Sequence, residues 1–315
     1  MLAYVEQPTA TAAQWAMRIG LFSAAMVVAA IPMHRLLGMG TPTFLNLLLV
    51  AFCGAAVALV LSAVSAIQIW RSGQPGTAAA LTGALTASAL LAWPAVFFAI
   101  SGGAPVINDV TTDVVSPPPF AALAGQRGPG ANPVSYNSAA LAPLQAAAYP
   151  DLRPFLLDRP VDEAFELAVE SLRYGLKYEI VAEVPPNQTA DGPGIIEAVD
   201  RTLIMGFYDD IVIRVIGDKV RSRIDIRSAS RYGRGDFGHN AARVRTILRD
   251  IKMRLDNSVP MTAGQRVARM KSRFDKTAVA KRRKGSDRGP ADRRSEQDRA
   301  RSDAQRGPEP KAKRP

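Results

Sequence analysis

Three apolar stretches in the first hundred residues constrain the fold more than any other feature of the chain. They cover about residues 15–35, 44–70 and 77–100. The second and third contain no Asp, Glu, Lys or Arg, and each exceeds the roughly 20 residues that a helix needs to cross a hydrocarbon core of about 30 Å. The first is marginal in length, and its alternatives are an uncleaved signal-like anchor and a buried helix. We predict a three-helix transmembrane region over residues 1–100.

The basic residues of the short loops predict the orientation of these helices. With three spans, Arg18 and Arg71 lie on one side of the membrane and Arg35 lies on the other. The segment 101–126, which follows the third span, has no Lys or Arg. Short loops that carry Lys and Arg stay in the cytoplasm. We therefore expect a multi-pass protein of the bacterial inner (plasma) membrane with its C-terminal domain in the periplasm.

The positive charge of the chain is concentrated at its C-terminal end. Residues 261–315 carry 18 Lys and Arg against 7 Asp and Glu, a net charge of +11 that equals the net charge of the whole chain. Residues 1–260 are therefore neutral. Because apolar periodicity is missing, residues 257–315 are predicted to form a disordered basic tail. This tail suits anionic lipid or polymer at least as well as nucleic acid, so nucleic acid is not the partner that we expect.

Cysteine and histidine usage limits the chemistry of the chain. There is one cysteine, Cys53, and there are two histidines, His34 and His239, far apart in the sequence. An intrachain disulfide and a Cys/His metal site are therefore excluded. His239 has no sequence neighbours that suggest a catalytic triad. We expect neither a metal nor a cofactor.

Two different patterns follow the third span. Residues 101–158 are rich in Pro and Ala and predict an extended tether, because proline interrupts regular elements. Residues 159–256 predict a helix over about 161–175, strands over about 177–186, 195–204, 211–217 and 220–230, and a helix over about 237–255. A turn at 187–194 separates the first two strands. The predicted fold class is α+β: an α-β-β-β-β-α domain in which a four-stranded antiparallel sheet carries two helices on one face.

The other face of this sheet is predicted to be polar and wet, because its strands alternate. Its residues would be Glu197, Arg201, Arg214, Arg223, Asp225 and Arg227. One interpretation is a solvated face with cross-strand charge pairs, each worth about 0.2–1 kcal/mol. The other interpretation is an anion-binding face, because the planar guanidinium of arginine fits carboxylates and phosphates.

The loop "SRYGRGDFG", residues 230–238, joins the last strand to the last helix. Its glycines permit positive φ angles, and Asp236 is the predicted N-cap of the helix. A Gly-rich turn that opens a helix can also hold an anion, and the sequence leaves both interpretations open. We predict that Arg227, Arg231 and Asp236 form one local network at this junction.

Three segments resemble a bacterial family called domain of unknown function 1499 (DUF1499). They are "INDVTTDVVSPPPF", "EAVDRTLIMGFYDDIVIRV" and "DIRSASRYGRGDFGHNAARVRTIL". The resemblance covers about residues 105–256, and the third segment is its most specific part. In the tether the family pattern falls on Asp109, Thr112, Asp113, Pro118 and Phe120, and in the domain it includes Glu197, Asp209, Asp210, Gly233 and Gly238. The resemblance implies no particular activity.

The function that we expect is that of a membrane-anchored envelope protein with a non-catalytic binding or interaction module. The candidate binding residues are Arg201, Asp209, Asp210, Arg214, Asp225, Arg227, Ser228, Ser230, Arg231, Asp236, Asn240 and Arg243. The alternative is a carboxylate-dependent hydrolase of an envelope substrate, which would combine one or more of these aspartates with a serine or a metal. Besides the lipid bilayer, the expected partner is an anionic envelope ligand or a protein.

Overall fold

The structure is a computed structural model that describes residues 8–101, 103–186, 192–258 and 264. The predicted basic tail, residues 257–315, lies almost entirely outside the described residues, and so does most of the predicted turn at 187–194. Both remain predictions.

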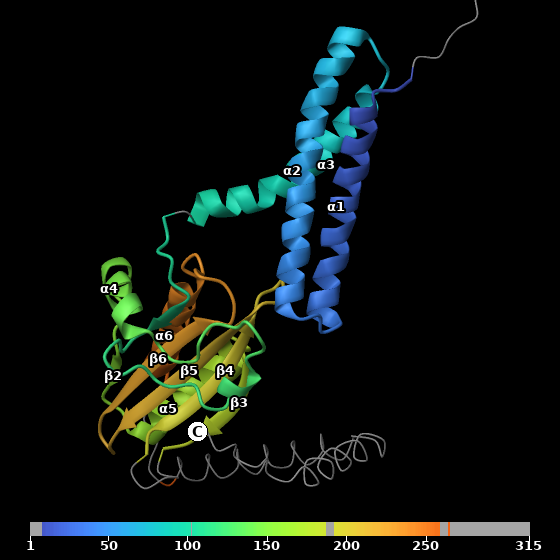
Figure 1. Ribbon diagram of the computed structural model, residues 1–315. Helices are drawn as coiled ribbons and strands as arrows, with labels where there is room; N and C mark the ends of the chain where they lie inside the picture. Colours follow the sequence, from blue (N-terminus) through green and yellow to red (C-terminus); the bar gives the residue numbers. More distant parts are fainter. Residues whose placement is uncertain (1–7, 102, 187–191, 259–263, 265–315) are drawn as a thin grey trace, which may run out of the picture. The chain divides into compact units, whose positions relative to one another are not determined.

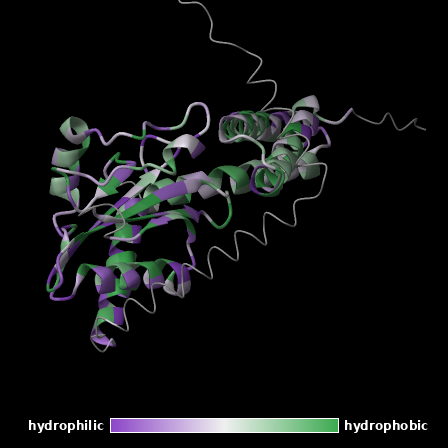
Figure 2. Ribbon diagram, turned by 90° about the horizontal axis from the view of Figure 1, so that it is seen from below, coloured by the Kyte–Doolittle hydropathy of each residue, from purple (hydrophilic) through white to green (hydrophobic). Residues whose placement is uncertain are grey.

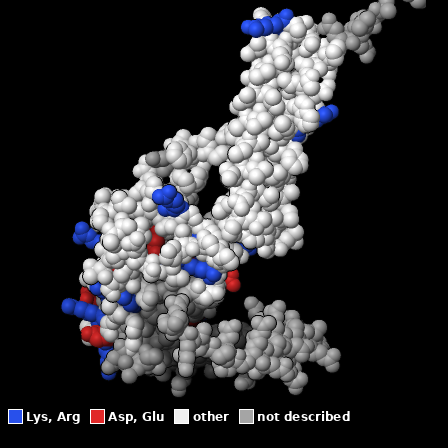
Figure 3. All heavy atoms as spheres, in the orientation of Figure 1, with Lys and Arg blue, Asp and Glu red and all other residues white. Residues whose placement is uncertain are grey.

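Three long helices form the N-terminal region: α1 (Thr11–Leu36), α2 (Thr41–Ser72) and α3 (Thr77–Ser101). All three are long and apolar enough to cross a membrane, which confirms the first stretch as a third candidate span. Figure 2 shows these helices mostly in green and pale shades, whereas purple residues are spread through the rest of the molecule. Their surface in Figure 3 is almost free of charge.

Small residues let these helices approach one another closely. A Cβ added to Gly83 on α3 would lie 2.7 Å from the backbone carbonyl carbon of Ala16 on α1, and a Cβ on Gly54 would lie 2.4 Å from the hydroxyl oxygen of Ser23. Helices in a membrane gain stability from such close packing, because lipid tails remove the hydrophobic drive for association. Glycines of the second and third spans therefore allow these helices to pack closely.

The rest of the described chain forms an antiparallel sheet with helices. Its elements are β1 (Asp109–Thr111), the short 3₁₀ helix Ala124–Gln126, α4 (Ser138–Ala148), β2 (Phe155–Leu157), α5 (Val161–Glu170) with a π-helical turn (Ser171–Gly175), β3 (Glu179–Val184), β4 (Gly194–Arg201), β5 (Tyr208–Gly217), β6 (Ser222–Ser230) and α6 (His239–Asp256). The strand order is β1-β6-β5-β4-β3, and β2 also pairs with β6 (Figure 1).

The prediction of a four-stranded sheet was wrong in number, because the sheet has six strands. The predicted meander is present as β3–β6, but β1 and β2 come from the Pro/Ala-rich segment. β1 pairs with residues 227–229 and β2 pairs with residues 222–224, both on β6. Without them β6 would be an edge strand whose backbone groups need other partners. Strands of three residues are too short to show a periodic pattern in the sequence.

One face of the sheet forms the apolar core. Helices α5 and α6 pack there through Phe165, Val244 and Ile247, against Ile211 and Ile226 of the strands. The Pro/Ala-rich segment contributes to the same core, because Ile107, Val110, Tyr149, Leu152 and Leu157 belong to it. The segment is thus part of the folded domain.

The opposite face is polar in composition, as the alternation indicates, but the prediction that it is wet was wrong. Glu197, Asp225 and Arg227 are only 1 %, 0 % and 2 % exposed. Residues 109–134 of the Pro/Ala-rich segment, which we call the covering segment, make the contacts with this face. Within it, Phe120 and Leu123 form a small apolar cluster with strand residues between the charges. The cover consists of irregular chain, whose contacts with a sheet have no signature in the sequence.

Candidate functional site

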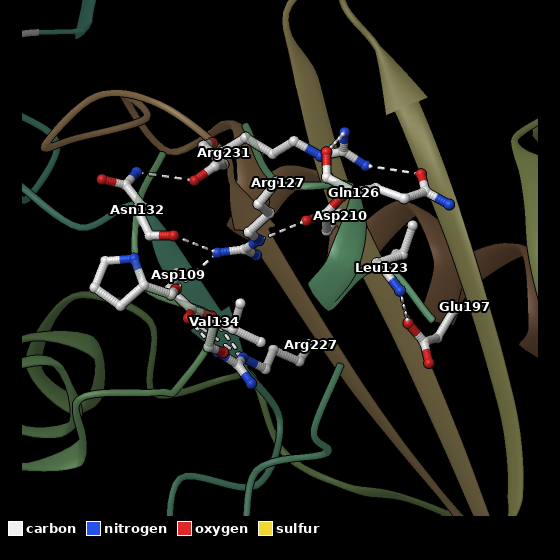
Figure 4. Close-up of polar contacts among 12 residues, drawn as sticks. Asp109, Leu123, Gln126, Arg127, Asn132, Val134, Glu197, Asp210, Arg227 and Arg231 are labelled. Atoms are coloured by element: carbon white, nitrogen blue, oxygen red, sulfur yellow. Dashed lines mark hydrogen bonds and ion pairs between the residues drawn. The ribbon is translucent and has the colours of Figure 1, made fainter. Parts of the chain in front are cut away.

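A buried ion pair holds the covering segment to the sheet. Nε and Nη2 of Arg227, on β6, donate to the carboxylate of Asp109, on β1, at 3.0 and 2.7 Å. Figure 4 shows this guanidinium beside Asp109 and Val134, and it donates to the carbonyl oxygen of Val134. It also donates to the carbonyl oxygen of Pro118 and lies 4.6 Å from the ring centroid of Phe120. Arg227 therefore has its donors occupied by the protein itself, and it fastens three separate points of the segment.

A second cluster joins two arginines to one carboxylate. Arg231 Nε donates to Oδ1 of Asp210 at 2.7 Å, and Arg127 Nε donates to Oδ2 of the same carboxylate at 2.9 Å (Figure 4). The Asp210 side chain is fully buried, and the side chains of Arg127 and Arg231 are 4 % and 9 % exposed. Two positive charges thus share one negative charge, which leaves this cluster with a net charge of +1.

A third cluster lies further along the same face. Arg214 and Asp225 are directly opposite each other on β5 and β6, and their side chains form an ion pair of 2.7 Å. Both Arg214 and Arg223 also pair with Asp113 of the covering segment. Burial tends to raise the pKa of Asp113, but the backbone hydrogen bond from Ser116 and the charge of Arg223 outweigh it, so the pKa lies below the usual value. The predicted cross-strand charge pair is therefore present, although it is largely buried.

A fourth network lies on the helix side of the sheet. Arg243 of α6 donates to Asp209 at 2.6 Å and to Asp200 at 2.9 Å. It also reaches Ser228 and Asn240 at 3.1 and 2.7 Å. Asp209 and its neighbour Asp210 project to opposite faces, as β-strand geometry requires, so the two carboxylates cannot act on one substrate atom.

The predicted network of Arg227, Arg231 and Asp236 was wrong. The two arginines pair with Asp109 and Asp210 instead. Asp236 accepts hydrogen bonds from the backbone N–H groups of Gly238 and Asn240 at 2.9 and 2.6 Å. The helix begins at His239, so Asp236 satisfies its first turn from two residues before the N-cap, Gly238. Burial raises the pKa of Asp236 even though these N–H groups act in the opposite direction.

The candidate residues thus do not converge on one exposed site. Those on the sheet and α6 are divided between the two faces and are largely engaged in ion pairs. Arg201 lies apart from them at the end of β4, where it donates to the carbonyl oxygens of Gly206 and Arg35. Within the described residues, no group of three His, Cys, Asp or Glu side chains is placed to hold a metal ion.

The structure instead contains a polar cavity between the covering segment and the β1–β6 edge, which we call the tether cavity. Its volume is about 470 Å³, and it is lined by Asn108, Asp109, Arg127, Asn132, Pro133, Ser135, Asn137, Leu141, Ala229 and Ser230. Asp109, Ala229 and Ser230 are buried, whereas Pro133, Ser135 and Asn137 are exposed. The cavity therefore has a buried floor and a solvent-exposed rim.

Sequence reasoning selected only Ser230 among these lining residues. The signal that could have found others is the polar run "ANPVSYN" at 131–137, which stands out in a segment dominated by Pro, Ala and Gly. Asp109 was visible only as a part of a family motif. Nothing in the sequence pairs Asp109 with Arg227 across 118 positions.

Two electrostatic features distinguish the tether cavity. Nη2 of Arg127 is buried and has no hydrogen-bond partner among the described residues, although Nε and Nη1 bind Asp210 and the carbonyl oxygens of Asn132 and Pro133. Burial raises the pKa of Asp109, and the bound Arg227 only partly opposes this. The guanidinium of Arg127 also lies 5.1 Å from the ring centroid of Phe120. The lining of the cavity thus includes an arginine with one buried nitrogen that lacks a hydrogen-bond partner among the described residues, and a carboxylate that ionises less readily than usual.

The comparisons with known proteins concern this same region. A sequence profile of the family described as "Protein of unknown function (DUF1499)" matches residues 109–251. No curated protein and no solved structure matches the chain. The matched range begins at the first residue of β1 and ends within α6. It includes the covering segment, all six strands and every residue that lines the tether cavity except Asn108. Residues 109–251 therefore form a DUF1499 domain, which follows three helices that are able to span a membrane.

Proposed function

We propose that this protein is a membrane-anchored envelope protein whose DUF1499 domain is a non-catalytic binding module with its ligand site in the tether cavity. One observation carries the proposal. Arg127 lines the cavity, and its Nη2 atom is buried and has no hydrogen-bond partner among the described residues. A buried donor without a partner costs about 1–3 kcal/mol, and more when it is charged. An acceptor atom supplied by a ligand would remove this cost.

Charge and shape define the class of ligand. Arg127 and Arg231 share the single carboxylate of Asp210, so a bound anion would balance the charge of the cluster. Arginine binds carboxylates and phosphates through charge-assisted hydrogen bonds. The side chains of Asn132, Ser135 and Asn137 also line the cavity and offer polar groups to hydroxyls or amides. The ligand is therefore a small polar group with a carboxylate or a phosphate, such as one unit of an anionic envelope polymer.

The positions of the aspartates favour binding over catalysis. Asp209, Asp210 and Asp225 each pair with arginine, and Asp236 is held by backbone N–H groups. These partners occupy the carboxylate oxygens that a substrate would have to contact. The hydrolase alternative retains one supporting observation: Asp109, whose pKa is raised by burial, lines the cavity together with Ser135 and Ser230.

The binding proposal is tested on the full chain in detergent with three probes: inorganic phosphate, acetate and glucuronate. We expect at least one probe to raise the melting temperature, because a ligand that binds only the folded state stabilises it by about 2.7 kcal/mol at a hundredfold excess over Kd. Arg127→Gln should abolish this shift. In the matched control, Arg245→Gln, the shift should persist, since Arg245 pairs with Asp151 at the surface.

Each variant is compared with its own probe-free melting temperature, so a loss of stability is not mistaken for a loss of binding. An equal shift in both variants would place the anion elsewhere. Turnover of a chromogenic ester or glycoside that Asp109→Asn abolishes would favour the hydrolase.

The location of the domain in the periplasm is part of the proposal and rests on the Arg distribution of the short loops. Alkaline phosphatase and green fluorescent protein are fused in turn after Ser258, behind the complete domain. We expect phosphatase activity and no fluorescence. Fluorescence without phosphatase activity would reverse the orientation and leave the cavity facing cytoplasmic ligands.

A further inference from the structure

The loop between β4 and β5 is unusually apolar for a hairpin connection. Its sequence over residues 202–207 is "TLIMGF", and the side chains of Leu203 and Ile204 are 82 % and 56 % exposed. Turns of soluble domains are ordinarily polar. Two neighbouring large aliphatic side chains at the tip of a hairpin indicate a contact surface.

The connection at the other end of β5 provides an internal comparison. Residues 218–221 read "DKVR", so the exposed Val220 stands among charged neighbours, at 66 % exposure. Asp218 accepts backbone hydrogen bonds from Val220 and Arg221 and closes the turn. This loop has the composition of an ordinary solvent-exposed turn. It follows β5, whereas the apolar loop precedes β5.

The apolar loop packs against the ends of two transmembrane helices. Met205 and Phe207 belong to a cluster with Phe44 and Leu48 of α2. Nδ1 of His34, near the end of α1, donates a hydrogen bond to the carbonyl oxygen of Met205 at 2.7 Å. With three spans, the α1–α2 turn and the domain after α3 must lie on the same side of the membrane. The contact is therefore compatible with a bilayer around the helices.

Two arginines accompany the loop. Arg35 donates to the carbonyl oxygen of Thr202 at 2.6 Å, and Arg201 donates to the carbonyl oxygen of Gly206 at 3.2 Å. The guanidinium of Arg201 also lies 4.8 Å from the ring centroid of Tyr208. Arginines beside exposed apolar side chains match the membrane interface, where the guanidinium meets lipid phosphates and the apolar groups enter the acyl region.

We propose that residues 202–207 dock the domain on the lipid bilayer. Leu203 and Ile204 enter the interfacial part of the leaflet beside the α1–α2 turn, and Arg35 and Arg201 face the lipid phosphates. The domain is then a surface-bound module with a fixed orientation. This docking does not depend on the ligand of the tether cavity.

The test is site-directed spin labelling of the full chain in vesicles of phosphatidylethanolamine and phosphatidylglycerol. Cys53 is first replaced by serine, because it is the one cysteine of the chain. Labels are then attached through L203C, I204C and, as the matched control, V220C. The measurement is the accessibility of each label to oxygen, which partitions into lipid, relative to a water-soluble nickel chelate.

We expect the labels at 203 and 204 to favour oxygen and the label at 220 to favour the nickel chelate. Adding Arg201→Gln should shift the label at 203 toward the nickel chelate, because the loop then loses a phosphate contact. Equal, water-like ratios at all three positions would overturn the proposal. So would labels at 203 and 204 that are shielded from both reagents and show spin–spin broadening, since the loop would then contact a second copy of the chain.

Discussion

Ile226 and Arg227 are neighbours on β6 that lie on opposite faces of the sheet, and both are dry, at 0 % and 2 % exposure. Ile226 packs into the core beneath α5 and α6. Arg227 lies beneath irregular chain and is held by Asp109 and two carbonyl oxygens. One sheet thus has two buried faces, one stabilised by apolar area and the other by matched charges.

The two kinds of face tolerate change differently. An apolar face loses stability in proportion to the atoms removed and to the cavity left behind. In a charged face a single deletion leaves its partner buried and unpaired, which costs more than the pair contributes. The charged face also determines where the covering segment lies, because each guanidinium donates only to carboxylate or carbonyl oxygens at a defined distance.

The largest effect is expected from Arg227→Ala, which leaves Asp109 buried without its partner. Removing one member of a buried ion pair costs about 3–5 kcal/mol. The free energy of unfolding from urea titration of the domain in the full chain measures this loss. Arg245→Ala is the control, since it removes an ion pair whose partners are 36 % and 53 % exposed, and such a pair is worth about 0.2–1 kcal/mol. Equal losses in the two variants would contradict the comparison.

The matched change on the apolar face is Ile226→Ala. We expect a loss of about 2–5 kcal/mol from the same titration, because the neighbouring core collapses only partly into the space. A double variant, in which Met replaces Arg227 and Leu replaces Asp109, distinguishes the charged face from the apolar face. This pair should be more stable than Arg227→Ala alone, since no unpaired charge remains. A double variant as unstable as the single one would mean that hydrogen bonds of Arg227 to the carbonyl oxygens dominate.

A smaller, pH-dependent effect is expected from Asp113→Asn. Hydrogen bonds to a charged group contribute about 1.5–3 kcal/mol, and Asp113 pairs with Arg214 and Arg223. Its pKa in the folded protein lies below the ordinary 3.8, so the unfolded chain takes up the proton first as the pH falls. The stabilisation is therefore complete above about pH 4 and is lost as the pH falls through the folded pKa. In unfolding titrations of both proteins from pH 7 to pH 3 the difference in stability should become smaller toward the acidic end. A constant difference would exclude the ionised carboxylate as its source.

The smallest effect is expected from Asp236→Ala. Asp236 satisfies two N–H groups at the start of α6, and the loss of a capping side chain costs about 1 kcal/mol. Thermal unfolding is the measurement, and Asp236→Asn, which keeps an acceptor oxygen, is the control. The melting temperature of the Asp236→Asn control should stay close to that of the unmodified protein. If both variants lose equally, the charge and not the hydrogen bond stabilises this junction.

The sequence predicts the parts of this molecule whose signal is local. The apolar runs predict all three helices, the strand patterns within residues 177–230 predict the meander β3–β6, and Gly-rich composition followed by helical periodicity locates α6. The prediction that Asp236 is the N-cap was wrong by two positions, because the N-cap is Gly238. Its predicted hydrogen bonds to N–H groups at the start of the helix are present, and they involve residues no more than four positions apart. The resemblance to DUF1499 was visible in three short motifs for the same reason.

The strands β1 and β2, the burial of the polar face and the tether cavity were decided by the tertiary structure alone. Each depends on contacts between irregular chain and a distant strand, such as Asp109 with Arg227 or Arg127 with Asp210. The alternation of β6 determined that Arg227 points away from the apolar core, but it did not determine whether water or protein meets the side chain there. That outcome depends on the position of the Pro/Ala-rich segment in the folded protein. An irregular segment satisfies its backbone through distant partners, and no residue period records them.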